Sequence, residues 1–175
     1  KLWRTRDPMG YHVEYAFSCM GYEIAGGLGA KMADPSREIY VMVGDGSYLM
    51  MSQELITSIQ EGMKLTIILI NNNGFASIGG LSASLGTEGF GTHYKYRNKK
   101  TGQLDGDYLP VDLAANAASM GATVLKARTL TDLNNALAES KKIRTTTVIY
   151  VETDKQKKVE GYSWWDVPVA AVAKQ

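Results

Sequence analysis

Two apolar runs, each followed almost at once by a polar residue, constrain the fold of this chain more than any other feature. Residues 39–43 lead to Asp45, and residues 65–70 lead to Asn72. Short apolar runs bounded by turn residues are typical of strands buried in a parallel sheet. A crossover helix between two such strands brings their carboxyl ends to the same edge of the sheet. Apolar residues that recur between the runs at roughly helical spacing are Leu49, Leu55, Ile56 and Ile59.

The residues at these two strand ends predict a site for a metal ion and a diphosphate. Asp45 offers a carboxylate and Asn72 an amide oxygen, and Mg²⁺ prefers such hard oxygen ligands, completing its shell with phosphate oxygens and water. Open α/β sheets bind their ligands at this edge. Gly44 and Gly46 allow close approach of the backbone, and amides that enter the next helix face an anion. A lone Gly-Asp-Gly would indicate only a turn, so the pairing with Asn72 carries the prediction.

The complete pattern resembles the signature of the thiamine diphosphate enzymes. It consists of Gly-Asp-Gly at 44–46, a spacer over 47–70 and Asn-Asn at 71–72. The resemblance implies an α/β, thiamine diphosphate-binding fold, with a mainly parallel sheet and helices on both faces. It also implies thiamine diphosphate and Mg²⁺ as cofactors.

The same resemblance assigns roles to individual residues. Asp45 and Asn72 would supply side-chain ligands to the metal, and the Gly74 carbonyl would supply a third. A backbone oxygen needs no side chain, so glycine can serve there. The residues expected along the diphosphate, through backbone amides or close approach, are Gly44, Gly46, Ser47, Ala76 and Ser77.

A second segment, residues 17–30, resembles the part of the family that places a bulky apolar side chain beneath the cofactor. Met20 occupies that position. The resemblance implies that the Met20 amide and the Ser18 carbonyl hydrogen-bond the aminopyrimidine ring. Judged by its spacing alone, Met20 also fits a core residue at the start of a helix, a common use of methionine.

Composition indicates one globular domain over residues 1–175, with 45% apolar residues and 19 basic residues against 18 acidic ones. The sequence lacks a stripe of basic residues of the kind that binds nucleic acid. The apolar runs are too short to cross a bilayer, and the first residues lack the apolar core of a signal peptide, so a soluble cytoplasmic protein is expected. The single cysteine, Cys19, excludes a disulfide within the chain, and we expect a small buried thiol.

Residues 75–110 are rich in glycine and show no sustained period. This pattern predicts a long loop, and loops of this length are uncommon unless they are functional or disordered. The resemblance implies that this region lies over cofactor and substrate, as a mobile covering loop. His93, Tyr94 and Tyr96 are candidate substrate contacts, with ordinary surface positions as the alternative. The regular pattern that follows predicts a helix, a strand, a helix and a strand, at 112–120, 122–126, 131–143 and 146–151.

The flanks resemble one branch of the family, which opens a cyclic 1,2-dione by carbon–carbon hydrolysis in myo-inositol catabolism. The resemblance rests on residues 2–12 and on residues 161–168, where Trp164 and Trp165 suggest a tail that docks onto another surface. It implies a small cyclic dione as substrate. An acetolactate synthase-like or 2-keto acid decarboxylase domain is the enzyme alternative, and a non-catalytic binding or assembly module is an alternative of another class.

In this family the glutamate that activates the cofactor belongs to a pyrimidine-binding domain of a neighbouring subunit. The resemblance therefore implies a homo-oligomer, at least a dimer, and assigns no catalytic residue to this chain. Glu23 and Glu54 are not expected to take the missing role. We expect the chain to be the C-terminal part of a longer multidomain polypeptide, and to be inactive by itself.

Overall fold

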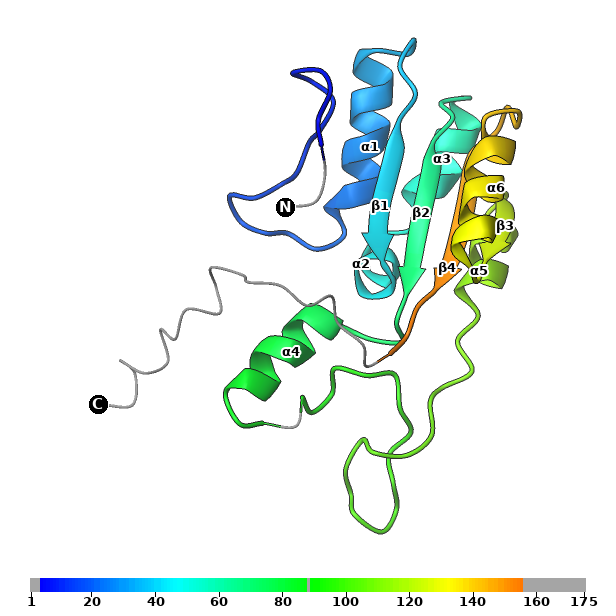
Figure 1. Ribbon diagram of the computed structural model, residues 1–175. Helices are drawn as coiled ribbons and strands as arrows, with labels where there is room; N and C mark the ends of the chain where they lie inside the picture. Colours follow the sequence, from blue (N-terminus) through cyan, green and yellow to red (C-terminus); the bar gives the residue numbers. More distant parts are fainter. Residues whose placement is uncertain (1–3, 88, 156–175) are drawn as a thin grey trace.

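A single parallel sheet organises the computed structural model, which describes residues 4–87 and 89–155 (Figure 1). Its strand order is β1-β2-β4-β3, and each neighbouring pair is parallel. Each strand begins and ends one residue later than predicted, so all four predictions are confirmed. The bounds are β1 Tyr40–Gly44, β2 Thr66–Asn71, β3 Thr123–Ala127 and β4 Thr147–Glu152.

Helices cover both faces of the sheet, as predicted. On one face, Leu28, Leu55 and Ala117, one from each of three helices, join the same buried cluster as Val43 and Leu69 of the sheet. On the other face, a fourth helix packs on the β3 and β4 half of the sheet. The three helices of the first face are α1 Tyr22–Ala33, α3 Glu54–Gln60 and α5 Leu113–Ser119, and the fourth is α6 Leu130–Ser140. No helix in the described part of the chain is both long and apolar enough to cross a membrane.

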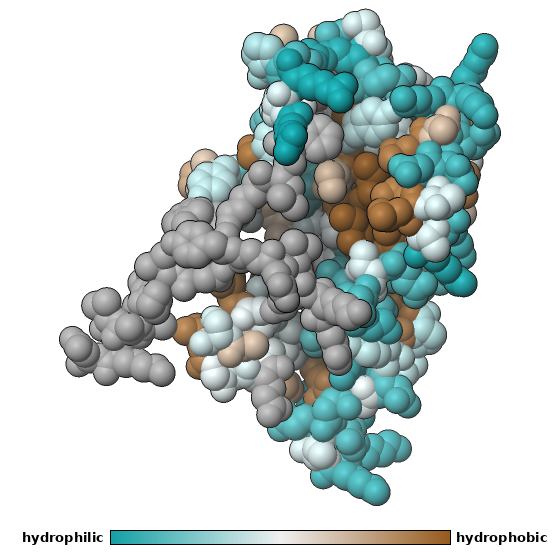
Figure 2. Space-filling model, viewed as in Figure 1, coloured by the Kyte–Doolittle hydropathy of each residue, from teal (hydrophilic) through white to brown (hydrophobic). Residues whose placement is uncertain are grey.

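The half of the second face that β1 and β2 form is open. Tyr40 and Met42 of β1 are exposed there, and Figure 2 shows apolar side chains gathered in front of these two strands. The sheet is therefore covered completely on one face and partly on the other among the described residues.

The segment between β1 and β2 forms two helices rather than the single one expected. A short α2, Asp45–Met50, ends before residues 51–53, and α3 follows. Leu55 is fully buried, whereas Leu49 and Ile56 are exposed. The break changes the helical phase, so the four apolar residues do not share one buried face.

The glycine-rich segment is also more regular than expected, because it contains the helix α4, Ala76–Ser84. None of the residues of α4 is buried. Gly79, Gly80 and the serines lower helix propensity, which explains why the sequence pattern indicated a loop. This helix starts directly after the predicted metal loop.

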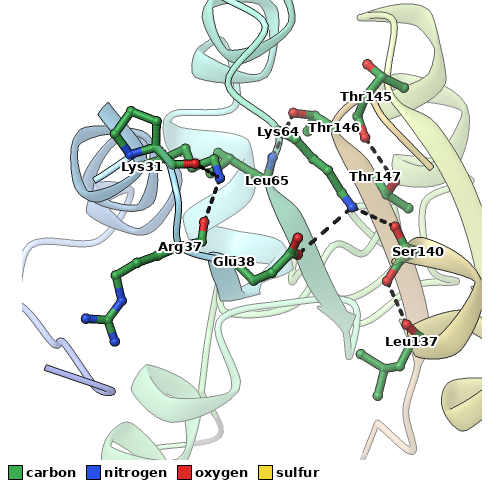
Figure 3. Close-up of polar contacts among 11 residues, drawn as sticks. Lys31, Arg37, Glu38, Lys64, Leu65, Leu137, Ser140, Thr145, Thr146 and Thr147 are labelled. Atoms are coloured by element: carbon green, nitrogen blue, oxygen red, sulfur yellow. Dashed lines mark hydrogen bonds and ion pairs between the residues drawn. The ribbon is translucent and has the colours of Figure 1, made fainter. Parts of the chain in front are cut away.

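At the amino edge of the sheet, where the strands begin, polar side chains bond to one another and to the backbone (Figure 3). The Lys64 ammonium donates to the Ser140 carbonyl at the end of α6, at 2.9 Å. The Thr146 hydroxyl accepts the Leu65 amide at 3.1 Å and lies 2.9 Å from the Ser58 hydroxyl. These contacts join α3, β2, α6 and β4.

The residues before α1 lie largely exposed. Cys19 is exposed rather than buried, so that prediction is wrong. The reason is local: its backbone amide donates to the Glu14 carboxylate in an irregular segment that precedes the helix. Trp164 and Trp165 lie outside the described residues, and the docking of the tail stays a prediction.

Candidate metal and diphosphate site

Asp45 lies at the junction of β1 and α2, at the carboxyl edge of the sheet, and is only 1% exposed. Its Oδ1 accepts the Gly46 amide and its Oδ2 accepts the Gly74 amide, both at 2.9 Å. Burial raises the pKa of Asp45, against the lowering effect of these backbone hydrogen bonds. No cationic side chain forms an ion pair with it among the described residues. A buried carboxylate held only by backbone amides is suited to receive a cation.

Asn72 completes the pair that the sequence predicts. Its Oδ1 is buried and has no hydrogen-bond partner within the described chain. Its backbone amide and that of Asn73 face the Asp45 carboxylate, so the structure brings the two strand ends together. An unpaired buried polar group costs about 1–3 kcal/mol, and a metal ion at this place would satisfy the amide oxygen.

A hydrogen-bond chain fixes the turn that carries Asn72. Asn73 adopts a left-handed conformation with φ 60°, which asparagine tolerates better than most residues. The Asn71 Oδ1 accepts the Asn73 amide at 2.9 Å, and the Asn71 Nδ2 donates to the Tyr150 hydroxyl at 2.5 Å. Sequence reasoning missed Tyr150, because nothing local connects a tyrosine on β4 with a turn after β2.

Close packing explains two of the glycines. A Cβ on Gly74 would lie 2.2 Å from the carbonyl oxygen of Thr92, and a Cβ on Gly46 would lie 2.5 Å from the Phe75 ring. The Phe75 amide also donates to the Thr92 carbonyl at 2.8 Å. The segment after α4 thus packs against the metal loop, and only glycine fits at these two positions.

The residues predicted along the diphosphate lie at the starts of two helices. Gly46 and Ser47 are in the first turn of α2, and Ala76 and Ser77 are in the first turn of α4. Neither helix has a side-chain cap, and uncapped first-turn amides favour an anion. The Gly46 amide already donates to Asp45, while Gly44 is exposed and extended just before α2.

The second predicted segment lies beside the end of α2. Met20 is half-buried, and Ser18 has a left-handed φ of 52°. A Cβ on the neighbouring Gly21 would lie 3.1 Å from the Met51 side chain. The roles of Met20 and Ser18 toward an aminopyrimidine ring stay predictions.

The three candidate substrate contacts differ in position. His93 pairs with Gly74 in an antiparallel bridge, and the Tyr94 amide donates to the Asn73 carbonyl at 3.1 Å. Tyr96 is 51% exposed. The structure therefore brings His93 and Tyr94, but not Tyr96, against the metal loop.

A comparison with models of protein families matches residues 1–151 to the C-terminal TPP-binding domain of thiamine pyrophosphate enzymes. The chain belongs to this family. Thiamine pyrophosphate is the same compound as thiamine diphosphate, so the predicted fold and the predicted family of cofactor-binding domains are confirmed.

Curated relatives of this thiamine pyrophosphate enzyme domain share almost the whole chain. The 3D-(3,5/4)-trihydroxycyclohexane-1,2-dione hydrolase of Bacillus thuringiensis (strain Al Hakam) is 45% identical over 99% of this chain and 27% of the relative. The protein of the same name from Bacillus cereus (strain AH820) is 46% identical over the same shares. The chain thus spans 27% of the length of these relatives.

Solved structures support the fold of the thiamine pyrophosphate enzyme domain. The 4-hydroxybenzoylformate decarboxylase of Rhodococcus jostii superimposes with a TM-score of 0.63 at 24% identity, over 79% of this chain and 24% of that one. The benzoylformate decarboxylase of Polynucleobacter necessarius gives 0.65 at 21% identity, over 81% and 25%. At this level of identity the likeness shows the fold alone.

The residues present fit the cofactor of the thiamine pyrophosphate enzymes and a divalent metal. The buried carboxylate of Asp45 and the unpaired oxygen of Asn72 match a hard cation, and the two uncapped helix starts match a diphosphate. Within the described residues, no group of three or more His, Cys, Asp or Glu side chains could hold a metal ion. A ligand set of one carboxylate, one amide and backbone oxygen is consistent with that finding.

Proposed function

We propose that this chain is the cofactor-binding domain of a thiamine diphosphate-dependent hydrolase that opens the ring of 3D-(3,5/4)-trihydroxycyclohexane-1,2-dione. The observation that carries the proposal is the match of 45–46% identity over 99% of the chain to relatives of that name. The Asp45 and Asn72 geometry supports it, because a domain that had lost the cofactor would have no need of an unpaired buried oxygen.

The residues of this chain would bind and orient the cofactor and its metal ion. Asp45, Asn72 and the Gly74 carbonyl would hold Mg²⁺, and the first-turn amides of Ser47 and Ala76 would face the diphosphate, with Ser77 beside them. Burial of Asp45 strengthens its interaction with the metal, because water screens the charges less. When bound, the thiamine ring supplies the electron sink for cleavage of a carbon–carbon bond.

The activity requires a second domain. The activating glutamate is expected from a pyrimidine-binding domain of a neighbouring subunit, so the working enzyme would be a cytoplasmic homo-oligomer of longer polypeptides. Positioned acid–base groups contribute about 10²–10⁴-fold to rate. The 175 residues alone are therefore expected to be inactive.

The test is product analysis with the full-length polypeptide that contains this sequence, supplied with thiamine diphosphate and Mg²⁺. The cyclic dione and pyruvate are offered separately. A ring-opened acid from the dione, with no product from pyruvate, supports the proposal. Acetolactate, acetaldehyde or acetate from pyruvate, with the dione unchanged, would indicate an acetolactate synthase-like or decarboxylase function. Failure to bind the cofactor with Mg²⁺ would indicate a non-catalytic module.

A further inference from the structure

Three buried side-chain atoms lack hydrogen-bond partners within the described chain: Asn72 Oδ1, His93 Nδ1 and Tyr94 Oη. All three atoms belong to the segments that surround Asp45. Buried polar groups in folded proteins nearly always have partners. Asn72 is accounted for by the metal, which leaves the His93 and Tyr94 atoms unexplained.

The backbone holds Tyr94 firmly against the metal loop. Its amide donates to the Asn73 carbonyl at 3.1 Å, and its carbonyl accepts the Leu109 amide at 2.7 Å. Its ring meets Phe75 edge-on, with the centroids 5.8 Å apart, and the Phe75 ring lies over Gly46 at the start of α2. Tyr94 is thus tied to both halves of the site.

The chemistry of the Tyr94 hydroxyl points to an anion. A tyrosine phenol keeps its proton near neutral pH and can donate a hydrogen bond. Burial, with the nearby Asp45 carboxylate, raises the pKa of Tyr94 further. Both Asp45 oxygens already accept backbone amides, and Tyr94 forms no hydrogen bond to them. The His93 Nδ1 lies beside the Gly74 backbone, 3.1 Å from the position of a Cβ on that glycine, and therefore faces the loop itself.

We propose that the Tyr94 hydroxyl donates a hydrogen bond to a phosphate oxygen of the diphosphate held at the Asp45 and Asn72 metal site. A diphosphate held beside Asp45 and Asn72 would supply an acceptor for this hydroxyl, which has no hydrogen-bond partner among the described residues. The inference rests on the proposed metal and diphosphate function. It makes Tyr94 a cofactor-binding residue instead of a substrate contact.

The test compares Tyr94→Phe with Tyr96→Phe in the full-length polypeptide. Calorimetry measures the affinity for thiamine diphosphate and, separately, for inorganic pyrophosphate, each with Mg²⁺. Tyr94→Phe should weaken both affinities by about 10- to 100-fold, the size expected for one hydrogen bond to a charged group. Tyr96→Phe, at an exposed position in the same segment, should change neither. The unfolding temperature without ligand should not fall in either variant, because Tyr94→Phe removes a buried hydroxyl that has no hydrogen-bond partner among the described residues and Tyr96 is exposed.

Two results with Tyr94→Phe would overturn the inference. Unchanged pyrophosphate affinity in Tyr94→Phe, with a higher KM for the dione, would make Tyr94 a substrate contact. A lowered unfolding temperature without ligand would make it a structural residue. Failure of the unmodified protein to bind either compound with Mg²⁺ would instead contradict the proposed function, and the inference that rests on it.

Discussion

The two edges of the sheet differ in how completely their polar side chains are paired. At the amino edge, Thr146 bonds to both Ser58 and Leu65, and Lys64 bonds to the end of α6. At the carboxyl edge, the buried Asp45 carboxylate has no cationic side-chain partner, and the Asn72 Oδ1 has no hydrogen-bond partner, among the residues that the structure describes. Among the described residues, the sheet therefore has a satisfied polar network at its amino edge, and buried polar atoms without partners at its carboxyl edge.

This difference distinguishes residues that stabilise the fold from residues that bind the cofactor. A fully paired polar cluster stabilises the fold, whereas unpaired buried groups persist only when something else compensates for their cost. Substitutions at the amino edge should change stability and leave cofactor binding intact. Substitutions at the carboxyl edge should do the reverse.

The strongest test of this contrast is Asp45→Asn. The change keeps the shape of the side chain but removes the carboxylate charge that we propose binds the metal ion, and puts an amide NH₂ group in place of one oxygen. We expect Mg²⁺-dependent affinity for thiamine diphosphate to fall more than about 100-fold, above the 10–100-fold typical of residues that only support a ligand. Calorimetry with and without Mg²⁺ measures the loss.

Asp112→Asn is the matched control for this substitution. Asp112 caps α5 by accepting the Ala115 amide at 2.9 Å, and asparagine caps a helix about as well as aspartate. The affinity of the Asp112→Asn variant for thiamine diphosphate with Mg²⁺ should match that of the unmodified protein. If Asp45→Asn bound the cofactor within a few-fold of normal, Asp45 would not be a metal ligand.

At the amino edge, Thr146→Val should have the largest effect on stability. Valine keeps the volume but leaves the Leu65 amide buried without its acceptor, and it removes the bond to Ser58. We expect the opening free energy of β2 and β4 amides to fall by about 2 kcal/mol. Native-state hydrogen exchange reports that value locally, and cofactor affinity should stay unchanged.

Thr145→Val supplies the comparison, because Thr145 enters the cluster through its backbone carbonyl and not its side chain. Equal losses in Thr145→Val and Thr146→Val would mean that β-strand packing, not the hydrogen bonds, sets the stability of this edge.

The carboxyl edge could be predicted from the sequence, whereas the polar network of the amino edge could not. The four strands, their parallel direction and the meeting of Asp45 with Asn72 follow from apolar runs that end in turn residues. The break between α2 and α3 and the helix α4 were missed, because local propensity is weak at glycines and serines and packing decides the outcome. Tyr150 was missed for another reason: its partner Asn71 lies far away in the chain, and only the pairing of β2 with β4 brings them together.

That pairing leads to an intermediate prediction, Tyr150→Phe. Loss of the hydroxyl frees the Asn71 side chain, which otherwise holds the left-handed turn at Asn73. We expect cofactor affinity with Mg²⁺ to fall about 10-fold, or roughly 1.4 kcal/mol, the usual size of one well-formed hydrogen bond.

Tyr48→Phe is the control, because the Tyr48 hydroxyl is also buried but donates to Asn116 on α5, at 2.8 Å, and not to the loop. It should lower stability while it leaves the affinity close to normal. Equal affinity losses in the two variants would show that any buried tyrosine hydroxyl near this edge matters equally, and Tyr150 would have no special positioning role.

The smallest expected effect concerns Lys64, whose ammonium lies at the carboxyl end of α6. A cation there favours the helix dipole and binds an otherwise free carbonyl, so Lys64→Met should lower the opening free energy of α6 amides by about 0.5–1 kcal/mol. Lys142→Met removes a cation from the same helix end, but Lys142 is exposed and bonds to the Glu139 side chain, so its effect should be smaller.

Glu38→Gln should change almost nothing, because Glu38 lies 4.0 Å from Lys64 with a side chain that is 59% exposed. Hydrogen exchange on the three variants ranks these contributions. If Glu38→Gln matched Lys64→Met, the ion pair and not the bond to the Ser140 carbonyl would stabilise the amino edge.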